Sequence, residues 1–190
     1  SLAKTPLLIS MDAEWGPSQR LSDVFAHPWN MTLGAIKDNS LVREISKRMA
    51  EQNIALGVHF KCSPSVDVNS NSKNTIIGNR SFGEDPNNVY NKAKAYIQGH
   101  KDVGVYTSIK HFPGHGDTDK DSHKTLPVIN GNMIRLNNVE LLPFRKLIDD
   151  GLAESVMLAH LSVPAIDKNY PSSLSSKTVT KLLREKYNFS

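Results

Sequence analysis

The segment from Lys110 to His123, with the sequence KHFPGHGDTDKDSH, holds the densest group of residues that could do chemistry in this chain. Its fourteen residues include three histidines, three aspartates, two lysines and two glycines, with almost no apolar side chain. The preceding residues Thr107, Ser108 and Ile109 are typical of the end of a strand. A polar, glycine-rich loop that follows a strand is a common way to display catalytic side chains on a rigid base.

Asp121 and His123 form the most specific pair within this loop. In an extended or turning segment, residues i and i+2 can face the same side, so the carboxylate can hydrogen-bond one ring nitrogen of the imidazole. That contact would fix the tautomer, raise the basicity of the ring and aim its other nitrogen at a substrate. The alternative interpretation is a surface loop in which an aspartate and a histidine are neighbours by chance.

A zinc site is a second interpretation of the same loop. Its possible ligands are His111, His115, His123, Asp117 and Asp121. The HxxxH spacing works best on a helix, where residues i and i+4 share a face. Pro113, Gly114 and Gly116 oppose a helix here, and this argues against a metal.

Two further clusters combine acidic, basic and aromatic residues. Asp12-Ala13-Glu14-Trp15-Gly16 follows an apolar run, with Arg20 shortly after, and Arg80-Ser81-Phe82-Gly83 precedes Asp85. Aspartate and arginine side chains around an aromatic ring are typical of sites that bind hydroxyl-rich ligands. Each cluster taken singly is also compatible with an ordinary loop salt bridge.

Four apolar runs and the helix-like segments between them must position these groups. The strand-like runs are 6–11, 55–60, 105–109 and 155–159, and the helix-like segments are expected to begin near Ser40, at Asp85-Pro86, near Asn138 and after Ser176. Near-continuous apolar strands separated by helices indicate a parallel sheet. Polar residues follow each run, as expected where functional groups lie at the carboxyl ends of parallel strands. The pattern suits a doubly wound sheet or part of a (β/α)8 barrel, and the absence of GxGxxG after the first run weakens a dinucleotide-binding version.

The composition excludes several classes of function. The 190 residues carry a net charge of +4, with scattered basic residues, so a nucleic-acid face is not indicated. No apolar run approaches the roughly 20 residues of a transmembrane helix. Cys62 is the single cysteine, so there is no internal disulfide framework.

The segment Lys110–His123 resembles the KH-(F/I)-PGHG-x-(T/V)-x-x-DSH signature of the β-N-acetylglucosaminidase branch of glycoside hydrolase family 3. PLLISMDAEWG, SPSVDVN and IIGNRSFGEDP are similar to three further stretches of that family, in the same order and spacing. The resemblance therefore covers essentially the whole chain. It implies a (β/α)8 TIM-type barrel that removes terminal β-linked N-acetylglucosamine with retention, by a two-step covalent mechanism and without a metal or other cofactor.

The resemblance also implies roles for individual residues. His123 would be the general acid/base and Asp121 the carboxylate that orients it. The residues that would bind sugar hydroxyls are Asp12, Arg80, Lys110 and His111, with Arg20 close by. Trp15 departs from the pattern, because many relatives have glycine there, and a bulky ring beside Asp12 is expected to reshape the cleft.

A second departure concerns the nucleophile that a retaining glycosidase needs. In the family it is an aspartate on a strand that follows a helix corresponding here to Ser176–Tyr187, and no such strand follows within the chain. The first two strands of the family barrel would precede Pro6. We therefore expect residues 1–190 to be a partial catalytic domain with about four of the βα units, incomplete and inactive alone, whose partner is the remainder of the parent barrel.

The leading interpretation is a segment of a glycosidase that acts on an N-acetylglucosamine-containing glycan or a cell-wall fragment, as in cell-wall recycling. The alternatives are a catalytically inactive carbohydrate-binding or scaffold module and a metal-dependent hydrolase. The Asp-Ala-Glu-Trp-Gly sequence resembles larger, exported members of the family. This favours a periplasmic or membrane-associated location over a cytoplasmic one.

Overall fold

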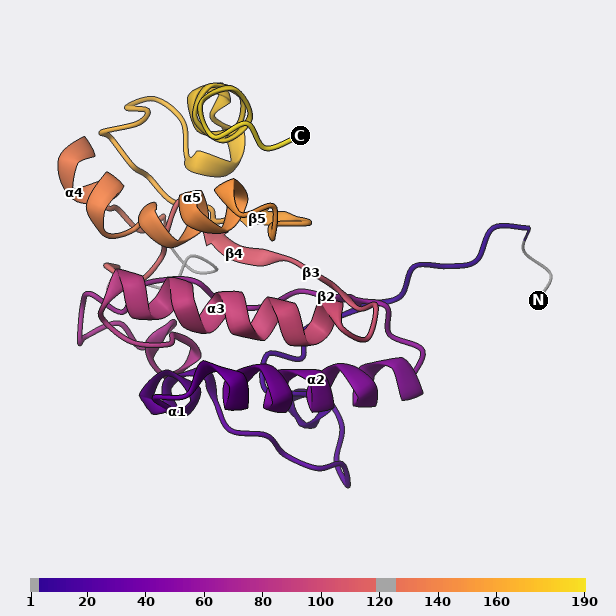
Figure 1. Cartoon of the computed structure of the whole chain (residues 1–190). Helices are drawn as coiled ribbons and strands as arrows, with labels where there is room; N and C mark the ends of the chain where they lie inside the picture. The colour runs from indigo at the N-terminus through magenta and orange to yellow at the C-terminus, as the bar shows by residue number, and fades with distance from the viewer. Residues whose placement is uncertain (1–3, 119–125) are drawn as a thin grey trace.

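The computed structural model describes residues 4–118 and 126–190 (Figure 1). Its strands are short and parallel, and they form two small sheets: β1 (Ser10–Met11), β2 (Phe60–Lys61) and β3 (Tyr106–Thr107) in one, β4 (Ile109–Phe112) and β5 (Val156–Leu158) in the other. The chain passes from the first sheet to the second at Ser108, whose N–H lies 3.0 Å from the carbonyl oxygen of Lys61. A parallel bridge between Ser65 and Lys110 also joins the two sheets.

All four predicted apolar runs contain or adjoin a strand, but the bounds differ. The run 105–109 is divided between β3 and β4, and β4 continues through Lys110 and His111 to Phe112. Lys110 and His111, which we expected in the loop after this strand, therefore belong to the strand itself. The run 55–60 begins as the end of a helix and is a strand only from Phe60.

The described residues form six helices, of which four match the predicted segments with shifted ends and two, Asn30–Ala35 and Met133–Asn138, were not predicted. They are α1 (Asn30–Ala35), α2 (Asn39–Ala55), α3 (Pro86–Lys101), α4 (Met133–Asn138), α5 (Leu142–Asp149) and the π-type helix η4 (Lys177–Lys186). Short 3-10 turns lie at η1 (Pro17–Gln19), η2 (Gly78–Arg80) and η3 (Ser172–Leu174).

The start of α3 agrees with the prediction in atomic detail. The Asp85 side chain accepts hydrogen bonds from the backbone N–H groups of Asn87 and Asn88, and Pro86 occupies the first helical position. At α2 the cap is Asp38, which accepts from Ser40 N at 2.8 Å, and Ser40 lies inside the helix. Asn138, expected to open a helix, instead ends α4.

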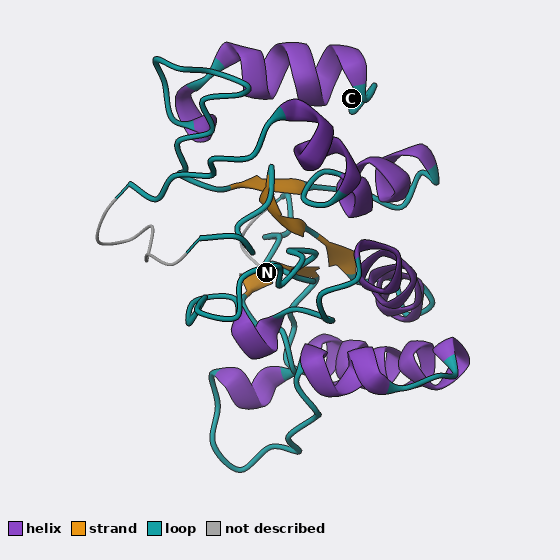
Figure 2. Ribbon diagram, turned by 90° about the vertical axis from the view of Figure 1, so that its left-hand side faces the viewer, coloured by secondary structure: helices purple, strands orange, loops and turns teal. Residues whose placement is uncertain are grey.

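The core lies between the strands and the helices that cover them. It combines Ile109 and Phe112 of β4 with Phe144 and Leu147 of α5, and it continues through Tyr96 of α3. Figure 2 shows the strands in the middle of the molecule and the longer helices along one side of them. Parallel strands with helices on one side are typical of the wall of a barrel, whereas a doubly wound sheet has helices on both faces. The described strands do not close a barrel.

No helix in residues 4–118 or 126–190 combines the length and the apolarity needed to cross a membrane.

Helices α2 and α3 pack so closely that one glycine between them has no room for a side chain. A Cβ on Gly99 would lie 2.3 Å from the carbonyl oxygen of Arg43 and 2.8 Å from Lys47 N. We expect Gly99→Ala to lower the free energy of unfolding by about 1–3 kcal/mol, because the helices must separate to accept the methyl group. Urea unfolding measures the change, with Asn91→Ala on the exposed face of α3 as the control, expected within about 0.5 kcal/mol of the parent. An increase in stability on Gly99→Ala, as for a solvent-exposed helical glycine, would contradict this packing.

Candidate active site

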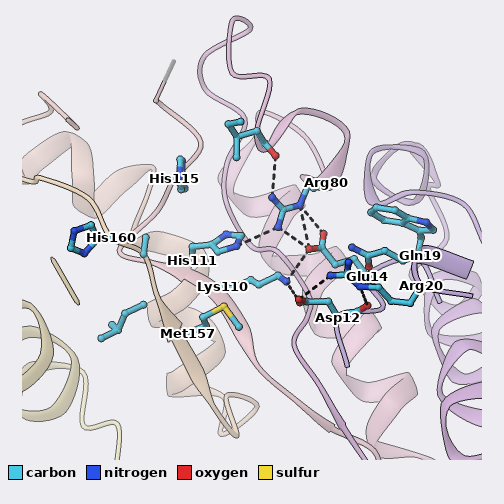
Figure 3. Close-up of a pocket in the computed structure, with 14 residues that line it drawn as sticks. Asp12, Glu14, Gln19, Arg20, Arg80, Lys110, His111, His115, Met157 and His160 are labelled. Atoms are coloured by element: carbon cyan, nitrogen blue, oxygen red, sulfur yellow. Dashed lines mark hydrogen bonds and ion pairs between the residues drawn. The ribbon is translucent and has the colours of Figure 1, made fainter. Parts of the chain in front are cut away.

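The main cavity lies where the strands end. Its volume is about 570 Å³. Its lining residues come from the segment after β1 through η1, from η2 and the residues before it, from β4 and the loop after it, and from β5 and the two residues after it. They are Asp12, Glu14, Trp15, Gln19, Arg20, Ile76, Arg80, Lys110, His111, His115, Met157, Leu158, Ala159 and His160. Figure 3 shows Asp12, Glu14 and Arg20 at one end of this group and His115 and His160 at the other. All five residues predicted to bind sugar hydroxyls, Asp12, Arg20, Arg80, Lys110 and His111, line this one cavity.

Glu14 is the centre of the charged end. Its carboxylate lies 2.9 Å from Lys110 Nζ, and it accepts two-point hydrogen bonds from Arg80, with Nη2 at 2.8 Å and Nε at 3.0 Å from its two oxygens. Burial raises the pKa of Glu14, but the hydrogen bond from Arg80 and the charge of Lys110 outweigh it and hold that pKa below its usual range. The buried carboxylate is therefore ionised and fixes two cations side by side.

Asp12 holds the outer side of the same cluster. Its two carboxylate oxygens pair with Lys110 Nζ at 3.0 Å and with Arg20 Nη2 at 3.2 Å. Burial raises the pKa of Asp12, and the contacts with Lys110 and Arg20 more than reverse that effect. Unlike Glu14, the Asp12 side chain is 41% exposed. Asp12 and the cations beside it thus present both charges to a ligand in the cavity.

Asp67 holds two histidines of the site, His111 and His115, by hydrogen bonds. This fully buried carboxylate accepts from the Nδ1 of His111 at 2.7 Å, from the His115 backbone N–H at 2.7 Å and from Ser65 Oγ at 2.8 Å. Arg80 Nη2 lies 3.3 Å from His111 Nε2. Because arginine can only donate, Nε2 of His111 is the acceptor in this contact, and Nδ1 is the ring nitrogen that donates to Asp67.

The glycines of the loop 113–118 have two different functions. Gly114 has a φ of +126°, which residues with a Cβ rarely adopt. Gly116 has an ordinary φ, but a Cβ there would lie 1.7 Å from the carbonyl oxygen of Val68. Gly116 therefore lets the loop lie directly against the segment that carries Asp67.

The structure gives no support for the zinc interpretation within the described residues. No group of three or more His, Cys, Asp or Glu side chains in residues 4–118 and 126–190 could hold a metal ion. The rings of His111 and His115 meet edge to face with centroids 6.0 Å apart, and Nδ1 of His111 is already bonded to Asp67. The proposed catalytic pair, Asp121 and His123, lies outside the described residues.

Trp15 does reach the cavity, as expected for a bulky residue at this position. Its indole stacks on that of Trp29, with ring centroids 4.0 Å apart and planes 10° from parallel. Trp29 precedes α1, where Asn30 donates to the carbonyl oxygen of Arg80 at 2.7 Å. The aromatic pair therefore joins the segment that carries Glu14 to the start of α1, and Asn30 links that start to Arg80.

From the sequence, Glu14 was named only within the Asp12–Gly16 cluster and His115 only as a possible zinc ligand, whereas Asp67 and His160 had no role beyond that of polar residues after a strand-like run. Glu14 had a usable signal, since it follows Asp12 by two residues after a strand and can face the same side. Asp67 also follows an apolar run, but nothing local pairs it with His111, 44 residues away. Such contacts depend on the parallel strand order.

Comparisons with known proteins cover essentially the whole chain. The model of the Glycosyl hydrolase family 3 N terminal domain matches residues 1–190. A beta-hexosaminidase of Nitrosomonas eutropha is 36% identical over the whole chain, which covers 56% of that protein. The structure of a glycoside hydrolase family 3 beta-N-acetylglucosaminidase from Paenibacillus sp. str. FPU-7 has a TM-score of 0.93 at 40% identity, with 97% of this chain and 35% of that one covered. The beta-glucoside phosphorylase BglX has the same TM-score at 31% identity, with 99% of this chain and 36% of that one covered. The chain thus spans about a third to a half of the length of these relatives.

The Asp67 cluster predicts a specific dependence of stability on pH. Burial raises the pKa of Asp67, but His111, His115 and Ser65 outweigh it and hold that pKa well below its usual range. A carboxyl with a lowered folded-state pKa stabilises the fold above its unfolded-state pKa of about 3.9, and this contribution is lost as the pH falls below that value. We expect Asp67→Asn to lower the free energy of unfolding at neutral pH by about 3 kcal/mol or more and to flatten its decrease below about pH 4.

Urea unfolding measured between pH 7 and 3, in steps of about one pH unit, gives both effects. Asp102→Asn is the matched control, because Asp102 pairs with Arg43 at the surface and exposed pairs contribute about 0.2–1 kcal/mol. Equal losses for the two variants at neutral pH would show that Asp67 does not anchor the site.

Proposed function

The chain belongs to glycosyl hydrolase family 3, and from this premise we propose that its parent protein removes terminal β-linked N-acetylglucosamine by a retaining mechanism. The observation that carries the proposal is the Asp12–Lys110–Glu14–Arg80 cluster with His111 beside it, in a cavity at the ends of parallel strands. Paired cations and a partly exposed carboxylate offer donors and acceptors in fixed positions, as a sugar with several hydroxyl groups requires.

Within this proposal, Asp12, Arg20, Arg80, Lys110 and His111 bind the hydroxyl groups of the terminal sugar. Lys110 has three N–H donors, and two of them face Asp12 and Glu14. The third is the donor we assign to substrate. Glu14 holds the cations in place, because both of its carboxylate oxygens are occupied by Arg80 and Lys110.

Catalysis needs two further groups. His123, oriented by Asp121, is proposed to protonate the departing oxygen and then to activate the water that completes the reaction. The nucleophile is proposed to be an aspartate that follows residue 190 in the parent protein, on the next strand of a (β/α)8 barrel. Residues 1–190 would then contribute about four of the βα units, and the remaining strands would close the barrel.

The natural substrate is proposed to be an N-acetylglucosamine-containing glycan or cell-wall fragment. The names of the beta-hexosaminidase relatives support the sugar. The resemblance of Asp12–Gly16 to exported members supports a periplasmic or membrane-associated location.

The proposed nucleophile can be located chemically. We expect the 190-residue chain alone not to hydrolyse aryl β-N-acetylglucosaminides, because an acid/base without a nucleophile cannot form the glycosyl-enzyme intermediate. The protein extended through the full barrel should be labelled by a slow fluorinated N-acetylglucosamine analogue on an aspartate within about ten residues after Ser190, at a strand end.

Peptide mass mapping identifies the labelled residue, and the corresponding fluorinated glucose analogue is the control for sugar specificity. Parent-like turnover by residues 1–190, or an adduct on Asp12, Asp117 or Asp121, would show that this chain carries the nucleophile itself.

The acid role of His123 predicts a dependence on the leaving group. In the full-length protein, His123→Ala should slow substrates with basic leaving groups by about 10²–10⁴-fold and activated aryl substrates much less. Asp121→Asn should follow the same trend with a smaller effect, because the imidazole remains. The measurement is kcat/KM across aryl glycosides of graded leaving-group pKa, and an equal decrease across the series would exclude His123 as the acid.

A further inference from the structure

His160 lies at the end of the cavity opposite the charged cluster. It follows β5 directly, lines the cavity and is exposed. Figure 3 shows it on the same side as His115 and away from Asp12 and Arg20. The terminal sugar is assigned to the Asp12 end, so His160 belongs to the part of the cavity that lies beyond that sugar.

The backbone around His160 is held by a buried serine. Ser172, in η3, donates from Oγ to the carbonyl oxygen of Ala159 at 2.7 Å and accepts from Leu161 N at 3.2 Å. Its own N–H donates to the carbonyl oxygen of Leu161 at 2.7 Å. Both neighbours of His160 are therefore fixed, although His160 itself is at the surface.

The imidazole is oriented by the next residue of the same turn. Nδ1 of His160 lies 2.6 Å from Ser173 Oγ. Among residues 4–118 and 126–190, no group hydrogen-bonds its Nε2. One ring nitrogen is thus used to fix the ring and the other is available to a ligand, which lowers the entropic cost of binding.

The surroundings indicate what kind of group this nitrogen would meet. Leu158 and Ala159 supply apolar cavity wall next to His160, whereas Met157 lies farther back along β5, where it pairs with Lys110 of β4. An apolar wall with one hydrogen-bonding group suits a sugar ring, which has an apolar face and hydroxyl groups at its edge. The charged end, by contrast, suits the dense hydroxyl pattern of the terminal sugar.

From this arrangement we infer that His160 is a substrate-binding residue for the leaving-group sugar, the ring on the far side of the bond that is cleaved, and that Ser173 is its positioning residue. This inference rests on the proposed function and adds a second subsite to it. The imidazole Nε2 hydrogen-bonds a hydroxyl group of that second ring, and Leu158 packs against its apolar face.

The test compares two ligands of the full-length protein by calorimetry: free N-acetylglucosamine and a non-hydrolysable, sulfur-linked β-disaccharide of N-acetylglucosamine. We expect His160→Ala to weaken the disaccharide by about 10-fold, the loss of one good hydrogen bond, and to leave the monosaccharide within about two-fold. Ser173→Ala should give a smaller loss for the disaccharide alone, and His160→Gln, which keeps a donor and an acceptor, should recover part of the affinity.

His59→Ala is the matched control, because His59 is also exposed but does not line the cavity. Equal weakening of both ligands by His160→Ala would place His160 at the terminal sugar, and no change in either would remove it from the site; both results overturn the inference. If the unaltered protein binds neither sugar, the proposed function is wrong and the inference falls with it. A normal monosaccharide affinity with an unchanged disaccharide affinity refutes the second subsite alone.

Discussion

The structure of the site depends on one buried carboxylate. Glu14 neutralises Lys110 and Arg80, two cations whose burial without a partner would cost several kcal/mol each. Its backbone is fixed as well: the Glu14 N–H donates to Gln19 Oε1 at 2.6 Å, and its carbonyl oxygen accepts from Tyr96 OH at 2.7 Å. The loop after β1, the end of β4 and the turn η2 therefore cannot move independently of one another.

A buried polar network lies below Glu14 and extends this constraint into the helical layer. Tyr96 of α3 also accepts from Lys61 Nζ at 2.7 Å, and that ammonium lies 3.1 Å from Nε2 of His100. Burial lowers the pKa of Lys61 well below its usual range, and burial is also the first cause that lowers the pKa of His100. These residues hydrogen-bond to one another. Through Tyr96, helix α3 therefore fixes the position of Glu14 together with the strands.

The sequence predicted the members of the site better than their connections. The start of α3 was predictable because Asp85-Pro86 is a local signal whose geometry is complete within four residues. The prediction that Ser40 caps α2 was wrong, because Asp38 and Ser40 both have side chains that can cap a helix. Only the backbone conformation at Asn39 decides which of them precedes the helix. The five residues that we propose bind the sugar came from a family resemblance. The contacts of Arg80 with Glu14 and of His111 with Asp67 join residues 66 and 44 positions apart, which no local pattern contains.

The two acidic residues after β1 differ in burial and in the number of partners that already occupy them. Glu14 is 2% exposed and is saturated by Arg80 and Lys110, whereas Asp12 is 41% exposed and shares only Lys110 with that buried cluster. A ligand hydroxyl can replace water at Asp12 without breaking the pair between Lys110 and Glu14. The cations are thus already in position before a ligand arrives, and binding does not require them to exchange partners. Charge that is fixed in advance of binding is also the arrangement that stabilises developing charge with the least reorganisation.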